Sequence, residues 1–208
     1  MAVRAVMFDF GGVISSSPFE SFARFEVEQG LPEGFVRQVN STNPDDNAWA
    51  QLERAEVDVE TFGNLWSAEA AALGRAVDGR LVLERLAGEI RPRMVEAVRI
   101  CGTAFKTACL TNNFVRAEAT LSDEAAAVYA LFDVVLESRV LGVRKPDPRF
   151  YEFACDALHV RPSEAVFLDD LGVNLKPARA LGMQTIKVED PDEALAELEQ
   201  ITGLTLIA

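Results

Sequence analysis

The apolar residues of this chain fall into short continuous runs that alternate with longer segments of helical period. The runs that have the length of buried strands cover residues 3–10, 107–111, 132–136, 165–169 and 184–188. Segments with apolar residues every three or four positions lie between them, at 94–100, 116–131, 148–158 and 174–181. This alternation of strands and helices predicts an α/β fold with a parallel sheet and right-handed crossover connections.

Residues 16–95 interrupt the alternation, because they contain helical patterns and no convincing strand. Ser17 followed by Pro18 is a favourable cap and first turn for the first of these helices. Further helical patterns cover residues 32–40, 48–55, 60–73 and 81–86. We therefore predict two domains: a Rossmann-like α/β core of residues 1–15 and 96–208, and an α-helical domain of residues 16–95 inserted after the first strand.

Composition and charge limit the possible partners of the protein. The chain has 208 residues, of which 49% are hydrophobic and 25% are charged, values that are typical of globular proteins. Its formal net charge of −13 repels phosphate backbones and anionic lipids, so neither nucleic acid nor a membrane is expected as a partner. The apolar run before Asp9 is too short for a signal peptide or a membrane span. We predict a cytoplasmic protein that is a monomer or a homodimer.

The histidine and cysteine content excludes several kinds of active site. His159 is the one histidine of the sequence, which argues against a Ser-His-Asp triad, a zinc site with several histidines and an H-E-x-x-H peptidase. It ends a helical segment, where we expect it to be exposed and non-catalytic. Cys101, Cys109 and Cys155 form no C-x-x-C pair and are expected to be reduced thiols in the core.

Polar side chains stand at the carboxyl ends of the predicted strands, where open parallel sheets bind their ligands. They are Asp9, Thr111, Asn112, Asp169 and Asp170, with Lys145 in a basic segment that follows the run 132–136. We expect these groups to converge on one edge of the sheet and to form a chemical site.

The charges at this edge favour magnesium-dependent chemistry on phosphorus. Asp9 and Asp170 would repel each other without a cation, and oxygen ligands without histidine or cysteine favour Mg²⁺. Asn174, four residues after Asp170, can help to hold the ion or its waters. A free carboxylate oxygen beside the ion suits attack on a phosphoryl group, and Lys145 can keep Asp9 ionised. Donors for the phosphoryl oxygens would come from Thr111, Asn112, Gly11 and Gly12.

Four sequence motifs resemble those of a known family, the haloacid dehalogenase (HAD) superfamily. They are Phe8-Asp-Phe-Gly-Gly-Val13, Leu110-Thr-Asn-Asn113, Lys145-Pro-Asp-Pro148, and Phe167-Leu-Asp-Asp170 with Asn174. Residues 167–183 are similar to the N-terminal phosphatase domain of soluble epoxide hydrolase and to the HAD-like domain fused to some acyl-CoA dehydrogenases. Residues 49–62 resemble the helical cap of the family, so the resemblance covers nearly the whole chain.

The resemblance implies that the protein is a Mg²⁺-dependent phosphohydrolase. Asp9 would be the nucleophile, which forms an aspartyl-phosphate intermediate. Asp9, Asp170 and the carbonyl oxygen of Gly11 would bind Mg²⁺, and Asp169 and Asn174 would support the acidic loop.

The resemblance also implies how a substrate is held. Thr111, Asn112 and Lys145 would bind the phosphate, and Lys145 would act as the catalytic cation. The substrate would be a small soluble phosphate ester, and residues 16–95 would form a cap that closes over the site.

Gly11 departs from the family pattern. HAD phosphatases usually carry a second aspartate two residues after the nucleophile, which protonates the leaving group and later activates water. The loss of a positioned acid/base costs about 10²–10⁴-fold in rate. A leaving group that needs no proton, or a residue of the insert such as Glu20 or Glu53, would compensate. Two alternatives remain open: a 2-haloacid dehalogenase, and a weakened phosphate- or Mg²⁺-binding module.

Overall fold

The computed structural model describes residues 2–84, 88–114 and 123–206, and within them five strands form one parallel sheet. The strands are β1 (Ala5–Phe8), β2 (Lys106–Thr111), β3 (Val134–Glu137), β4 (Ala165–Asp169) and β5 (Gln184–Lys187), in the order β3-β2-β1-β4-β5. Each run that the sequence predicted to be a strand overlaps one of them. The prediction of an α/β fold with a Rossmann-like parallel sheet is confirmed.

Strand β1 lies at the centre of the sheet and is buried on both of its faces. Val6 and Phe8 pack into one hydrophobic cluster, whereas Ala5 and Met7 pack into another on the opposite face. A central strand of this kind has to be apolar at successive positions, which explains the continuous apolar run at the start of the sequence.

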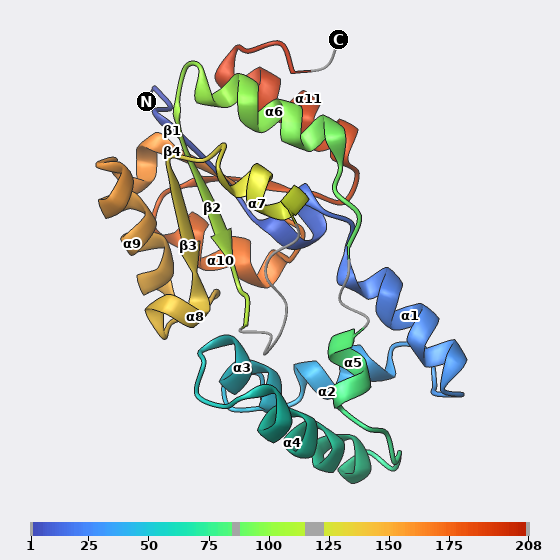
Figure 1. The fold of residues 1–208 in the computed structure, drawn as a ribbon. Helices are drawn as coiled ribbons and strands as arrows, with labels where there is room; N and C mark the ends of the chain where they lie inside the picture. Colours follow the sequence, from blue (N-terminus) through green and yellow to red (C-terminus); the bar gives the residue numbers. More distant parts are fainter. Residues whose placement is uncertain (1, 85–87, 115–122, 207–208) are drawn as a thin grey trace.

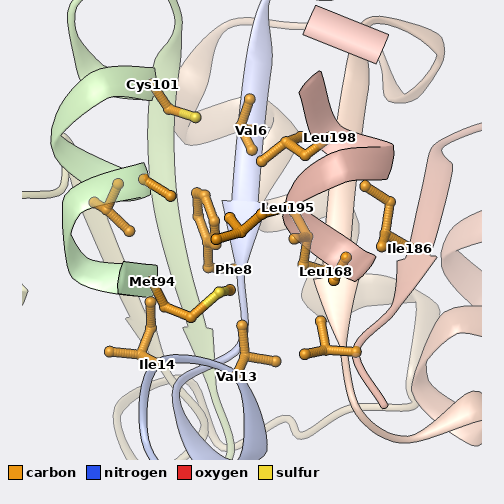
Figure 2. Close-up of a cluster of buried hydrophobic side chains, with 14 of the residues drawn as sticks. Val6, Phe8, Val13, Ile14, Met94, Cys101, Leu168, Ile186, Leu195 and Leu198 are labelled. Carbon is orange, nitrogen blue, oxygen red and sulfur yellow. The ribbon is translucent and has the colours of Figure 1, made fainter. Parts of the chain in front are cut away.

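Helices cover both faces of the sheet (Figure 1). Those on the face of Val6 and Phe8 are α6 (Pro92–Gly102), α7 (Asp123–Tyr129) and α11 (Pro191–Thr202). Those on the opposite face are α9 (Pro148–Leu158) and α10 (Gly172–Ala180), while the short α8 (Ser138–Leu141) follows β3. Figure 2 shows how Phe8, Met94 of α6 and Leu195 of α11 gather in one cluster.

Residues 18–84, which we call the helical insert, fold around a hydrophobic cluster of their own. The insert contains α1 (Pro18–Glu28), α2 (Phe35–Ser41), α3 (Ala48–Glu53), α4 (Val59–Ala72) and α5 (Arg80–Glu84). Trp66 is fully buried there, and its indole N–H donates a hydrogen bond to Asn40 Oδ1 at 2.8 Å. Figure 1 shows the insert at the end of the sheet to which the strands point. The insert therefore stands over the edge where the sequence predicts the site.

The two segments that connect the helical insert to the sheet pair with each other. Ser15 and Ile90 form an antiparallel bridge, and the Arg91 N–H donates to the Ile14 carbonyl oxygen at 2.8 Å. Arg91 Nη1 also donates to the carbonyl oxygen of Gly12 at 2.6 Å. The chain thus leaves and re-enters the sheet layer at one place.

Several predicted helices have different limits in the structure. The segment predicted at 116–131 contains α7, and its first part falls at 115–122, outside the described residues. Residues 85 and 86 of the segment predicted at 81–86 also lie outside them. Helix α6 begins at Pro92, inside the range predicted for the helical domain, and packs on the sheet.

The exposure of the histidine and the burial of the cysteines agree with the predictions from the sequence. His159 is exposed and follows α9 with a φ of 55°. Cys101, Cys109 and Cys155 are buried and unpaired, and burial raises the pKa of the Cys155 thiol to about 11. Among the described residues, no helix combines the length and apolar character that a membrane crossing requires.

Candidate active site

The site lies where the carboxyl ends of β1, β2 and β4 meet. Phe8 pairs with Cys109 of β2 and with Leu168 of β4, so Asp9 and Asp169 follow at the same level of the sheet. The Asp9 N–H donates to the Leu168 carbonyl oxygen at 2.8 Å, which extends the pairing by one residue. Thr111, 5% exposed, ends β2 at this same edge. Parallel register therefore brings together side chains that are far apart in the sequence.

Lys145 stands at the centre of the charged cluster. Its side chain is fully buried, with Nζ 2.8 Å from Asp9 Oδ2 and 2.7 Å from Asp169 Oδ2. Burial lowers the pKa of Lys145, but the charges of Asp169 and Asp9 outweigh that effect and raise the pKa above its usual value. The amine is thus a protonated cation, and its removal would leave two buried carboxylates without their partner.

Asp9 is held at both of its oxygens. While Oδ2 contacts Lys145, Oδ1 accepts a hydrogen bond from the Phe10 N–H at 2.6 Å. Burial raises the pKa of Asp9; Lys145 lowers it, and the charges of Asp169 and Asp170 raise it further, so the pKa lies well above its usual value. A further cation beside Asp9 would favour the ionised form that a nucleophile needs.

The carboxylates of Asp9, Asp169 and Asp170 form a group that can hold a metal ion. One oxygen of each lies within 4.8 Å of the others. Burial and the charge of Asp169 raise the pKa of Asp170 to about 6, so a divalent cation would relieve repulsion within the group. All the donors are oxygen atoms, which suit Mg²⁺. The donor set therefore fits this ion.

Asp169 differs from the other two carboxylates because the protein already engages both of its oxygens. Oδ1 accepts a hydrogen bond from the Leu171 N–H at 2.8 Å, and Oδ2 contacts Lys145. Asn174 Nδ2 lies 3.0 Å from Oδ1 and 3.1 Å from Oδ2. Asp169 and Asn174 thus hold the loop after β4 and the lysine. This arrangement favours Asp9 and Asp170 as the residues that face an ion.

Gly12 allows the turn after β1 to pass close to Asp170. Its φ of +77° lies in the left-handed region, which side chains rarely adopt. A Cβ atom at this position would lie 2.2 Å from Asp170 Oδ2. The turn needs glycine for both reasons, and the space that a side chain would fill is taken by an acidic group of the candidate metal site.

We expect Gly12→Ala to displace Asp170 and to weaken metal binding. Strain and steric overlap together should destabilise the fold by about 1–3 kcal/mol. More specifically, the rise in melting temperature that MgCl₂ gives the parent protein should be lost. Gly34→Ala is the matched control, because Gly34 has a similar φ of +75° with no atom within 4 Å of the added Cβ. An equal response of both variants to MgCl₂ would contradict the expected displacement of Asp170.

The backbone at residue 11, unlike that at residue 12, does not require glycine. Its φ of −71° and ψ of 130° are extended values that any residue adopts, and no atom lies within 4 Å of a Cβ added there. The fold therefore does not impose glycine at the position where HAD phosphatases usually carry an aspartate. The backbone and the space around residue 11 would accommodate an aspartate, so the structure gives no steric reason for its absence.

Asn112 holds the backbone of Lys145. Its Oδ1 accepts a hydrogen bond from the Lys145 N–H at 2.9 Å, and its Nδ2 donates to the Lys145 carbonyl oxygen at 3.0 Å. Nδ2 also lies 3.2 Å from Glu53 Oε2 of the helical insert. Because both ends of the side-chain amide are engaged, a contact of Asn112 with phosphate would have to come from its backbone N–H. Its side chain positions the lysine.

Of the two acidic residues of the insert that the sequence analysis singled out, Glu53 reaches the site and Glu20 is exposed. Glu53 contacts both Asn112 and Arg144. Arg144 was not among the residues that the sequence predicted. The one available signal was its position directly before Lys145, which does not reveal a partner 91 positions earlier in the chain.

Relatives of this chain come from several organisms. It is 37% identical to acyl-CoA dehydrogenase family member 10 of Mus musculus, over 98% of this chain and 19% of that protein. It is 33% identical to bifunctional epoxide hydrolase 2 of Sus scrofa, over 100% of this chain and 40% of that protein. The chain thus spans less than half the length of these two relatives. It is 31% identical to phosphatase MT3486 of Mycobacterium tuberculosis, over 91% of this chain and 88% of that protein.

Solved structures share the fold. A predicted HAD-like hydrolase from Porphyromonas gingivalis matches with a TM-score of 0.66 at 20% identity, over 95% of this chain and 98% of that one. A HAD family enzyme from Bacteroides thetaiotaomicron, in complex with magnesium and inorganic phosphate, matches with a TM-score of 0.60 at 18% identity, over 91% and 97%. The sequence-family model of the haloacid dehalogenase-like hydrolases matches residues 3–182 of this chain. The chain therefore belongs to the family of haloacid dehalogenase-like hydrolases.

Proposed function

We propose that this protein is a Mg²⁺-dependent phosphohydrolase that hydrolyses a small phosphate ester through an aspartyl-phosphate on Asp9. The observation that carries the proposal is the buried cluster in which Lys145 contacts Asp9 while Asp170 lies within metal-sharing distance. Such a cluster offers a nucleophile, a fixed positive charge and an oxygen site for a hard cation. The likeness to a phosphatase of Mycobacterium tuberculosis supports the same chemistry.

In the proposed reaction, a carboxylate oxygen of Asp9 forms a bond to phosphorus while the bond to the leaving-group oxygen breaks. Water then hydrolyses the acyl phosphate, which releases inorganic phosphate and restores the carboxylate. Lys145 favours the ionised form of Asp9 and balances the charge of the phosphoryl group. Thr111 and the backbone N–H groups of Gly12 and Asn112 would donate to the phosphoryl oxygens.

Asp9, Asp170 and the carbonyl oxygen of Gly11 would hold Mg²⁺ in this scheme. When bound, the ion neutralises charge on the phosphate and orients it. Asp169 and Asn174 would keep the acidic loop and the lysine in place, which the four contacts of Asp169 support.

We also propose that the predicted helical domain of residues 16–95, without its last residues that form the start of α6 on the sheet, acts as a cap over the site. The helical insert has its own hydrophobic cluster and lies at the end of the sheet where the charged groups converge (Figure 1). A cap in this place would exclude bulk water from the site while Asp9 attacks the phosphoryl group, and would contact the leaving group. A cytoplasmic location and a monomeric or dimeric state stay predictions from the sequence.

The test is a screen of the purified protein against a panel of aryl and alkyl phosphates, in MgCl₂ and in EDTA. We expect phosphate release that requires Mg²⁺. Halide release from 2-haloacids in EDTA would instead favour the dehalogenase alternative. Mg²⁺-dependent binding of phosphate without turnover of any ester would favour a binding module.

We expect Gly11→Asp to raise kcat for alkyl phosphates. The extended backbone and open space at residue 11 accept the side chain without strain, and the new carboxyl group stands two residues after Asp9. A positioned general acid/base is worth about 10²–10⁴-fold, and most for leaving groups that need a proton. The measurement is kcat with alkyl and with aryl phosphates. Gly11→Asn is the isosteric control that donates no proton in this way, so equal rates for the two variants would contradict the explanation.

A further inference from the structure

Three polar contacts tie the helical insert to the segments around Lys145, and each of them involves Glu53 or Arg144. Arg144 Nη1 donates to the Pro44 carbonyl oxygen at 2.8 Å. Arg144 Nε forms an ion pair with Glu53 Oε2 at 2.6 Å. The N–H bond of Nε does not point at this oxygen, so the contact is not a hydrogen bond. Asn112 Nδ2 donates to the same oxygen at 3.2 Å. The insert is therefore fixed to the sheet layer directly beside the catalytic lysine.

Glu53 is a buried carboxylate whose two oxygens serve different elements. Its side chain is 9% exposed. Oε1 accepts a hydrogen bond from Trp49 Nε1 at 2.9 Å, inside the insert, whereas Oε2 faces Asn112 and Arg144 of the sheet layer. A buried carboxylate is costly unless partners compensate its charge, and Glu53 has two donors and a cation around it.

These surroundings are unsuited to the general acid that Gly11 leaves missing. A general acid has to carry a proton that it gives to the leaving group. Trp49 Nε1 donates to one oxygen of Glu53, and Asn112 Nδ2 and Arg144 face the other, so both oxygens are already engaged by the protein and neither is left to face a leaving group. Glu53 is placed to hold other groups.

We propose that Glu53 is a positioning residue for Lys145, an inference that rests on the proposed phosphohydrolase function. Asn112 Nδ2 is shared between Glu53 Oε2 and the Lys145 carbonyl oxygen, so the carboxylate fixes the amide that clamps the lysine backbone. Arg144, the residue before Lys145, is held by the same oxygen. Glu53 can therefore help to orient Lys145 only while the helical insert is packed against the sheet.

This arrangement links closure of the helical insert to the chemistry. If the insert moves away, Glu53 leaves both Asn112 and Arg144, and the segment that carries Lys145 loses two of its fixed contacts. Misplacement of a catalytic group by about 1 Å costs on the order of 10²-fold in rate. The reaction on Asp9 would therefore run at full rate only with the insert in place.

The kinetic test compares Glu53→Gln with Glu56→Gln. Glutamine has one acceptor oxygen and cannot satisfy Trp49, Asn112 and Arg144 together, so we expect kcat to fall by about 10- to 100-fold. The loss should be equal for aryl and alkyl phosphates, because a positioning defect is independent of the leaving group. Glu56 pairs with Arg54 at 2.7 Å on the surface of the same insert, and its variant should keep full activity. A loss confined to alkyl phosphates would overturn the proposal and make Glu53 the acid.

A double-mutant cycle tests the pairing with Arg144. Arg144→Met and Glu53→Gln each remove the ion pair, so the loss of kcat in the double variant should be smaller than the product of the two single losses. Effects on kcat that multiply would show two independent roles and would overturn the proposal.

Tryptophan quenching gives a readout that does not depend on turnover. Trp66 is fully buried, whereas Trp49 is half-buried and bonded to Glu53, so acrylamide quenching reports mainly on Trp49. We expect stronger quenching in Glu53→Gln and Arg144→Met than in Glu56→Gln. Unchanged quenching would overturn the tie between insert and sheet. If quenching increases in these variants but the parent protein has no phosphatase activity, the proposed function is wrong, whereas the contact between insert and sheet through Glu53 is supported.

Discussion

Asp9→Asn should abolish hydrolysis of phosphate esters, with a fall in kcat of about 10⁴-fold or more. The amide of asparagine can still accept the hydrogen bond from the Phe10 N–H, so the turn after β1 should survive. It cannot form the acyl phosphate, and it carries no charge to pair with Lys145. The measurement is kcat with an activated aryl phosphate in saturating MgCl₂.

Asp192→Asn is the control for this loss of charge. Asp192 pairs with Arg93 at 2.5 Å on the surface of α11, and 59% of its side chain is exposed. That variant should hydrolyse the same ester at the parental rate. Hydrolysis by the Asp9→Asn protein at a comparable rate would end the case for Asp9 as the nucleophile.

Lys145→Met should have the largest effect on stability. The substitution keeps the length of the side chain but leaves Asp9 and Asp169 buried without the cation between them. Removal of one partner from a buried ion pair typically costs about 3–5 kcal/mol. We expect that loss in the free energy of unfolding by urea, and MgCl₂ should restore part of it because the ion replaces part of the missing charge.

Lys187→Met is the matched control at the end of β5. Lys187 forms an ion pair with Glu189, but the two side chains are 50% and 72% exposed. Exposed pairs contribute about 0–1 kcal/mol. Equal unfolding free energies for the two lysine variants would show that Lys145 does not stabilise the fold by compensating the charges of Asp9 and Asp169.

Much of the fold follows from local sequence patterns. Helix α9 begins and ends where the sequence predicts, because the Asp147 side chain caps it and Pro148 occupies its first turn. Helix α2 begins at Phe35, later than the predicted range 32–40. Glu26, from another helix, accepts hydrogen bonds from the Gly34 and Val36 N–H groups and so holds the turn before it. A contact of this kind depends on tertiary structure and leaves no periodic signal.

The candidate site shows the same division between local and long-range information. Its carboxylates and lysine stand at strand ends that the apolar runs reveal, so their convergence could be predicted. The clamp of Asn112 on the Lys145 backbone and the pair of Glu53 with Arg144 could not. These contacts depend on how the helical insert packs on the sheet, and no local pattern in the sequence encodes that packing.

The bridge between Ser15 and Ile90 has an evolutionary consequence. An inserted segment whose two ends lie side by side can be lengthened, shortened or exchanged without displacing the strands of the sheet. If residues 18–84 contact the leaving group as proposed, selection could remodel its recognition while the edge of the sheet that carries Asp9 and Lys145 stayed constant. A chimera that carries the corresponding segment of a relative, but retains a glutamate at position 53, should keep the phosphoryl chemistry and acquire a new preference among esters.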